Sequence, residues 1–185
     1  MSFTQELVRV VGRATRGVHA GADKLASRRI ARLQWPALPV MSPAFLSGGP
    51  LPLWSTVDGV GEPPPLVWGP PPRGTRALVV MVEDPDVPYP HPFVHWIVYG
   101  IPAAARGVDP ATLESFTQGK NGRREIGFAP AAPPPGHGLH HYHFQVFALD
   151  TDLALEPHLG RPAVVDYMRG HVRAWGEIVG TYERD

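Results

Sequence analysis

Clusters of proline and glycine interrupt the sequence from residue 36 onward and limit each apolar run to about the length of one strand. The chain has 185 residues, of which 23 are proline and 20 are glycine. Because proline cannot donate to a central ladder, these clusters belong at strand ends and in loops. The main clusters are SGGP at 47–50, EPPP at 62–65, GPPPRG at 69–74, PDVPYPHP at 85–92 and PAAPPPGHG at 130–138. The pattern predicts a single β-rich domain over residues 36–185.

Three apolar segments between the clusters are the firmest strand predictions. They are RALVVMVE at 76–83, FVHWIVYGI at 93–101 and HHYHFQVFALD at 140–150. The first two are apolar almost throughout, which is typical of central strands that are buried on both faces.

The segment 161–178 is predicted to be a helix. Pro162 suits a first helical turn, and Val165, Met168, Val172 and Trp175 follow at intervals of three or four residues.

The first 35 residues differ from the rest of the chain in charge. Residues 6–33 contain seven basic and two acidic side chains, whereas the whole chain has 17 of each sign. Apolar residues recur there at helical spacing, and Gly17 and Gly21 are predicted to separate two helical pieces. We interpret residues 1–35 as a basic helical extension that docks on the domain, or across the interface of a homodimer. The alternative is contact with an anionic lipid surface.

Composition excludes several classes of protein. A formal net charge of zero disfavours a nucleic-acid-binding protein, and the absence of cysteine excludes disulfides, thiolate metal sites and cysteine nucleophiles. The N-terminus lacks the features of a signal peptide, and no run approaches the roughly 18 apolar residues of a membrane helix. We therefore expect a cytoplasmic protein with no cofactor.

Polar side chains gather at the ends of the three predicted strands. Asp84 and Asp86 follow the first strand, His95 lies in the second, and His140 and Tyr142 begin the third. Because alternate residues of an extended strand share a face, we expect Asp84 and Asp86 on one face, and likewise His140 with Tyr142. A neighbouring carboxylate favours a protonated imidazole, so His95 or His140 could be a cation near neutral pH.

The backbone near these side chains could also meet an anion. Glycine lets the chain of Gly136, His137 and Gly138 curl, so that its N–H groups could surround a small anion. Together with the polar side chains this predicts a site for a small phosphorylated or zwitterionic ligand. The alternative is structural: the aspartates form Asx turns and the histidines are satisfied core residues.

Catalytic and metal sites are weaker interpretations. His141 and His143 form a His-x-His pair, but they project opposite to His140 and Tyr142, so no single metal ion could bind all four. The sequence has no G-x-S-x-G motif and no glycine-rich phosphate loop before a helix. We predict no metal site and no catalytic residue, and hence a non-enzymatic binding protein.

Three long segments resemble the signature regions of the phosphatidylethanolamine-binding protein family, and most closely its bacterial Raf-kinase-inhibitor-like branch. They are DPDVP (84–88), HPFVHWIVYGIP (91–102) and APPPGHGLHHYHFQVFALD (132–150). The likeness extends from about residue 40 to the C-terminus and is specific, because the motifs stand in the right order at plausible spacing. It implies a large antiparallel sheet packed with a smaller one, and a helix near the C-terminus.

The resemblance also implies a small pocket that accepts phosphate-like or phosphoethanolamine-like anions. By position its polar residues would be Asp84, Asp86, His95, His140 and Tyr142, with Pro88 and Pro134 in its walls. It further implies modulation of a kinase or protease partner. The alternative is a phosphopeptide-binding module whose small-molecule site is vestigial; a metal-dependent enzyme is less favoured.

Three expectations follow. The five polar residues should meet around one cavity. Replacing His140 by alanine should abolish anion binding with little loss of stability, because we expect its partners at a mouth reached by solvent. At least one cis X-Pro bond should lie near 85–88 or 133–135, since dense prolines in tight turns are where such bonds occur.

Overall fold

The computed structural model describes residues 3–30, 35–152 and 156–185. Its main element is a five-stranded antiparallel sheet in the order β6-β4-β3-β7-β8. These strands are β3 (Ala77–Asp84), β4 (Phe93–Pro102), β6 (Thr117–Gln118), β7 (His140–Leu149) and β8 (Val172–Tyr182). A smaller antiparallel sheet has the order β1-β2-β5, with β1 (Val40–Met41), β2 (Leu66–Trp68) and β5 (Gly107–Val108). The two sheets confirm the predicted architecture, and the ends of the three predicted strands lie within one residue of those of β3, β4 and β7.

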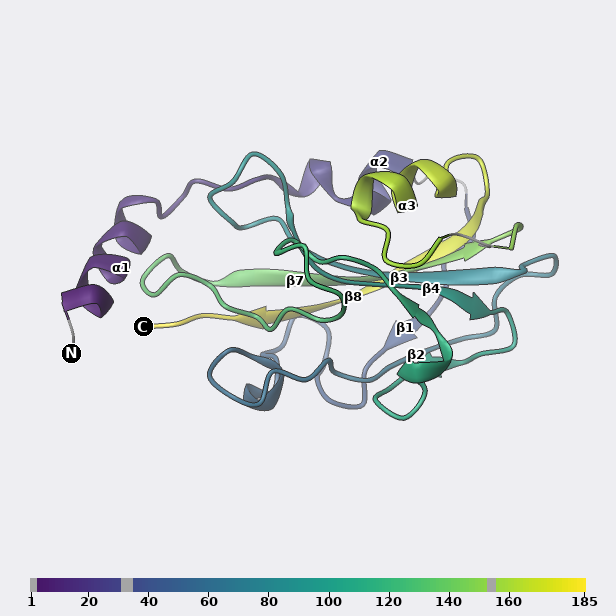
Figure 1. The fold of residues 1–185 in the computed structure, drawn as a ribbon, viewed down its shortest axis with the longest axis horizontal. Helices are drawn as coiled ribbons and strands as arrows, with labels where there is room; N and C mark the ends of the chain where they lie inside the picture. Colours follow the sequence, from purple (N-terminus) through teal and green to yellow (C-terminus); the bar gives the residue numbers. More distant parts are fainter. Residues whose placement is uncertain (1–2, 31–34, 153–155) are drawn as a thin grey trace.

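Short helices complete the fold. They are α1 (Phe3–Ala14), η1 (Ala22–Lys24), α2 (Ala26–Ile30), η2 (Leu53–Ser55), η3 (Leu113–Ser115) and α3 (Arg161–Met168). Figure 1 shows α2 and α3 over one face of the large sheet, β1 and β2 on its other side, and α1 beyond one end of it.

Strand β3 lies at the centre of this arrangement, and all eight of its residues are buried. Leu78, Val80 and Val82 belong to the core between the two sheets. Val79 and Met81 belong to the core beneath α3. A strand that is covered on both faces favours apolar residues on both, which explains the unbroken apolar run over residues 77–82.

A buried carboxylate at the end of β3 joins the helices to the sheet. Glu83 is fully buried, and its Oε2 accepts hydrogen bonds from Ala26 N at 2.7 Å and Gln145 Nε2 at 2.8 Å. Its Oε1 accepts from Arg161 Nε at 2.5 Å. Because a buried charge must be paired and hydrogen-bonded, this group fixes α2 and α3 against the sheet.

The predicted helix over 161–178 is wrong in its second half. Helix α3 ends at Met168, Gly170 adopts a φ of +82° that reverses the chain, and β8 begins at Val172. Strand β8 then pairs with β7 along its length, with Trp175 opposite Phe147. The helical spacing of the apolar residues was outweighed by pairing with a neighbouring strand, which local periodicity does not report.

The N-terminal extension forms two helical pieces, α1 and α2, and both Gly17 and Gly21 between them have positive φ. Residues 1–2 and 31–34 of the predicted extension lie outside the described residues. The segment docks on its own domain, while Leu7, Val10 and Val11 of α1 are more than half exposed. Within the described ranges, the protein contains no helix with the length and apolar character needed to cross a bilayer.

Candidate functional site

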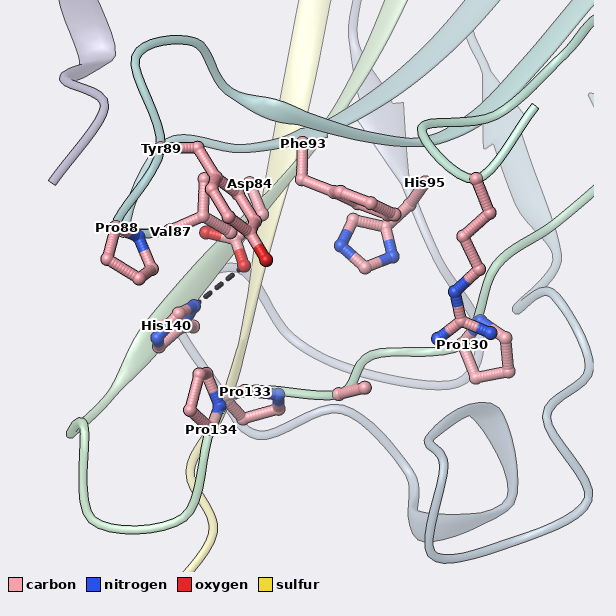
Figure 2. Close-up of a pocket in the computed structure, with 12 residues that line it drawn as sticks. Asp84, Val87, Pro88, Tyr89, Phe93, His95, Pro130, Pro133, Pro134 and His140 are labelled. Atoms are coloured by element: carbon pink, nitrogen blue, oxygen red, sulfur yellow. Dashed lines mark hydrogen bonds and ion pairs between the residues drawn. The ribbon is translucent and has the colours of Figure 1, made fainter. Parts of the chain in front are cut away.

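A cavity of about 280 Å³ opens at the ends of β3, β4 and β7. Its walls include two loops: the aspartate-proline loop (residues 85–92), which joins β3 to β4, and the glycine-histidine loop (residues 133–139), which leads into β7. Figure 2 shows the polar side chains pointing into the space between these loops. The lining residues are Asp84, Val87, Pro88, Tyr89, Phe93, His95, Arg123, Pro130, Ala132, Pro133, Pro134 and His140.

The sheet order explains why distant residues meet here. Strand β3 is hydrogen-bonded to β4 on one side and to β7 on the other. This places Asp84, His95 and His140 side by side although up to 56 positions separate them in the sequence. Of the eight predicted site residues, five line the cavity: Asp84, Pro88, His95, Pro134 and His140.

A chain of hydrogen bonds runs from the cavity to the glycine-histidine loop. His140 Nδ1 donates to Asp84 Oδ2 at 2.7 Å, and both side chains are almost fully buried. The other nitrogen, His140 Nε2, lies 2.8 Å from His137 Nδ1. Burial and the adjacent His140 hold the pKa of His137 below its usual value. His137 is therefore neutral near pH 7, and the Asp84–His140 pair is extended by a second imidazole.

His95 occupies the wall formed by β4. Its Nδ1 donates to the Ala129 carbonyl at 2.7 Å, which leaves Nε2 as a hydrogen-bond acceptor. Burial lowers the pKa of His95, and the favourable charge of Asp84 does not compensate for it. This direction favours a neutral His95 over the cation that the sequence allowed at His95 or His140, because desolvation outweighs the nearby carboxylate.

Arg123 is a lining residue that the sequence analysis missed. It follows Asn121 and Gly122, and its backbone N–H donates to Asn121 Oδ1 at 2.9 Å. Gly122 N donates to Val94 O at 2.7 Å, so this turn is anchored to β4 beside the cavity. The Asn-Gly pair was the available signal, since it marks a tight turn that can present the next side chain.

Asp86 does not share a face with Asp84, contrary to prediction. The chain turns directly after β3, where Asp86 N donates to Asp84 Oδ1 at 2.8 Å in an Asx turn. The Asp86 carboxylate instead accepts hydrogen bonds from His141 N at 2.7 Å and His141 Nδ1 at 2.8 Å. It lies outside the cavity lining. The structural alternative of an Asx turn is therefore correct for Asp84, which also lines the cavity.

Tyr142 and Gly136 lie outside the cavity lining as well. The Tyr142 ring packs edge-on against His95, with centroids 5.0 Å apart. Burial raises the pKa of Tyr142 well above its usual value, and its hydroxyl has no partner among the described residues. Gly136 faces Arg13 of the N-terminal segment. The cavity thus includes Asp84, His95 and His140 but not all five predicted polar residues.

The cis-proline prediction is wrong. Every peptide bond in the described ranges, including those in both proline-rich loops, is trans. The glycine-histidine loop reverses direction through Gly136 and Gly138, whose φ angles are +78° and +114°. Glycine accepts these angles without strain, so the turn needs no cis bond.

Within the described residues, His, Asp and Glu side chains do not form a group of three that could hold a metal ion. His143, on the face of β7 opposite to His140, pairs with Glu177 of β8 at 3.0 Å instead.

Fold and site together define a class of protein: a two-sheet β-domain with a small polar pocket where its central strands end. The model of the family described as "Phosphatidylethanolamine-binding protein" matches residues 41–183. The chain therefore belongs to the phosphatidylethanolamine-binding protein family, and the resemblance inferred from the sequence is confirmed.

Relatives and solved structures agree with this assignment. The chain is 39% identical over 141 residues to a UPF0098 protein of Pyrococcus horikoshii, covering 72% of this chain and 71% of that protein. A Chlamydia trachomatis UPF0098 protein is 37% identical over 148 residues, covering 78% of this chain and 97% of that protein. A crystal structure of a phosphatidylethanolamine-binding protein homolog from C. trachomatis superposes with a TM-score of 0.75 at 37% identity, covering 80% of this chain and 99% of the other. The crystal structure of E. coli YbcL, described as a member of the mammalian PEBP family, superposes with a TM-score of 0.74 at 30% identity. The match covers 81% of this chain and 100% of YbcL.

Proposed function

We propose that the cavity binds a small phosphate-bearing anion of the phosphoethanolamine type and that the protein acts by binding rather than by turnover. The observation that supports this best is the charge distribution in the lining: Arg123 is a permanent cation, whereas the carboxylate of Asp84 is already paired with His140. A phosphate group placed against Arg123 would gain charge-assisted hydrogen bonds.

The remaining groups suit the other parts of such a ligand. His95 Nε2 is an acceptor that can accept a hydrogen bond from a phosphate hydroxyl or an ammonium group. The rings of Tyr89 and Phe93 line the same space and can attract an ammonium group through their π faces. A cavity of about 280 Å³ accommodates a ligand of only a few heavy atoms.

The absence of turnover is proposed from the lining chemistry. The residues described around the cavity include no serine, threonine, cysteine or lysine nucleophile, and both ring nitrogens of His140 are engaged by Asp84 and His137, which leaves His95 and Tyr89 as the other lining groups with a lone pair. Both Asp84 oxygens accept hydrogen bonds, from Asp86 N and His140 Nδ1, so this carboxylate is held in place rather than free to attack.

Calorimetric titration with inorganic phosphate and phosphoethanolamine tests the proposal. Arg123→Gln should weaken phosphoethanolamine binding by about tenfold or more, the size expected for one charge-assisted hydrogen bond. Arg124→Gln is the matched control. It removes the same charge at the next residue, whose side chain lies outside the cavity lining. Equal affinities for wild type and Arg123→Gln, or no binding of either probe, would overturn the proposal.

The phosphopeptide alternative makes a different prediction in the same assay. A module that recognises a phosphorylated protein segment, such as one from a kinase or protease partner, should prefer a phosphoserine peptide over phosphoethanolamine by about tenfold or more. A pocket for the free small molecule should show no such preference. The partner and the cytoplasmic location stay predictions from the sequence.

A further inference from the structure

Residues 12–24, here called the strap, run along the aspartate-proline loop and hold it through four hydrogen bonds. Figure 1 shows this part of the chain passing from α1 toward α2. Ala20 N donates to Val87 O at 2.9 Å and Gly21 N donates to Pro85 O at 3.1 Å. The side chains add His19 Nδ1 to Asp86 O at 3.1 Å and Lys24 Nζ to Pro90 O at 3.0 Å. Four carbonyl groups of this loop, those of Pro85, Asp86, Val87 and Pro90, thus point to the strap.

The beginning of the strap contacts the opposite wall. A Cβ atom on Gly12 would lie 2.2 Å from the carbonyl oxygen of Pro135, so the α1 backbone approaches the glycine-histidine loop more closely than any other residue type allows. Glycine inside a helix costs about 1 kcal/mol relative to alanine. This close contact gives the unfavourable glycine in the interior of α1 a physical reason.

Between these two contacts the strap covers His137. That imidazole is 2% exposed, and the His19 ring lies edge-on to it at 5.7 Å. The charged and polar groups that face His137 are His140, His19, Asp84 and the Thr15 carbonyl. His137 Nδ1 in turn contacts His140 Nε2, and His140 donates to Asp84. One side chain, His137, therefore lies between the strap and His140, which lines the cavity.

We propose that the strap is a positioning element of the pocket: it fixes the spacing of the two loops and excludes water from His137, which keeps His140 directed at Asp84. The effect on ligand affinity rests on the proposed function, whereas the effect on the histidine chain does not. The strap residues touch the loops and His137 but do not line the cavity.

Gly12→Ala in the full chain tests this inference. The added methyl group should raise the helix propensity of α1, so any loss of docking cannot come from a weaker helix. The control is Val11→Ala, which also raises helix propensity but changes an exposed side chain. His19→Ala removes both the hydrogen bond to Asp86 O and the ring that lies edge-on to His137, and it should act in the same direction as Gly12→Ala.

Two readouts are used. NMR of the imidazole groups follows two signals. The pKa of His137 should rise toward its ordinary value in Gly12→Ala, because water reaches the ring. The low-field His140 Nδ1–H signal should broaden in the same variant. Calorimetry with phosphoethanolamine should show an affinity lower by about threefold or more in Gly12→Ala, because the pocket is less preorganised. Val11→Ala should match wild type in both.

The outcomes separate the two proposals. Unchanged histidine signals in Gly12→Ala would overturn the inference, and so would altered signals with unchanged affinity. If wild type fails to bind phosphoethanolamine, the proposed function fails; altered His137 and His140 signals would then still support the control of the histidine chain by the strap.

Discussion

Asp84 and His140 form a buried pair in which His140 Nδ1 donates to Asp84 Oδ2 at 2.7 Å, and their side chains are 2% and 0% exposed. The two residues come from adjacent strands, at the end of β3 and the start of β7. This burial contradicts the premise that the partners of His140 are reached by solvent, so we expect removal of His140 to cost stability.

His140→Ala should therefore destabilise the protein by about 3–5 kcal/mol, since it leaves the Asp84 carboxylate buried without its partner. The double variant Asp84→Asn with His140→Ala should lose less than the sum of the single losses, because no unpaired charge remains. Urea unfolding at pH 7 measures the free energy of unfolding of His140→Ala, Asp84→Asn and the double variant. A loss below about 1 kcal/mol for the single variant would mean that the pair is solvated in solution.

Stability should fall with mild acid because of His95 and His137, whose pKa values in the folded protein lie below the ordinary 6.5. As the pH falls through 6.5 the unfolded chain takes up protons that the folded protein does not. The stability that these neutral histidines provide is complete above pH 6.5. It is lost as the pH falls toward the pKa values of the two histidines in the folded protein.

The variant His95→Asn isolates the His95 contribution to this pH dependence. Its amide can donate to Ala129 in place of Nδ1 but does not titrate. Denaturation curves between about pH 7 and about pH 5 should show a smaller loss of stability for His95→Asn than for wild type. Identical pH slopes would rule out the proposed burial of a neutral His95.

Arg161→Met should cost about 3–5 kcal/mol, because it leaves the fully buried Glu83 without its cationic partner. Glu83→Gln should cost less: its amide oxygen can still accept from Ala26 N, and the Arg161 side chain is 23% exposed and can reach water. Thermal unfolding of Arg161→Met and Glu83→Gln compares their losses of stability. The opposite order would show that the network is held by Glu83 hydrogen bonds rather than by charge pairing.

Gly176→Ala should destabilise β8 by about 1–3 kcal/mol through overpacking. A Cβ atom there would lie 1.7 Å from the Leu38 carbonyl oxygen, and Leu38 N donates to Trp175 O at 2.8 Å, so this stretch is pinned to the strand. Gly160→Ala is the control, since its nearest neighbour would be Pro162 Cδ at 3.9 Å. Equal unfolding midpoints for Gly176→Ala and Gly160→Ala would contradict the close contact between Gly176 and the Leu38 carbonyl group.

The central strands and three polar residues of the pocket could be predicted because their signals are local. The run from 77 to 84 is buried on both faces, so its apolar character is continuous and its polar end at Asp84 stands out. His95 and His140 lie in similar strands, and the family motifs place all three residues in order. Antiparallel pairing of neighbouring strands then brings them together.

Other features depend on contacts that the local sequence does not reveal. Arg123 reaches the cavity because Gly122 is hydrogen-bonded to β4, a pairing across 28 residues that no periodic pattern indicates. Asp86 leaves the expected face because Asp84 accepts its backbone N–H and turns the chain. The docking of α1 depends on the close approach of Gly12 to Pro135, which is a tertiary contact.

A crystal structure of the protein soaked with phosphoethanolamine tests the central claim most directly. The account predicts one molecule in the cavity, with its phosphate group against Arg123 and its ammonium group toward Asp84 and the rings of Tyr89 and Phe93. An empty cavity at saturating ligand, or a molecule bound only outside these residues, would contradict it.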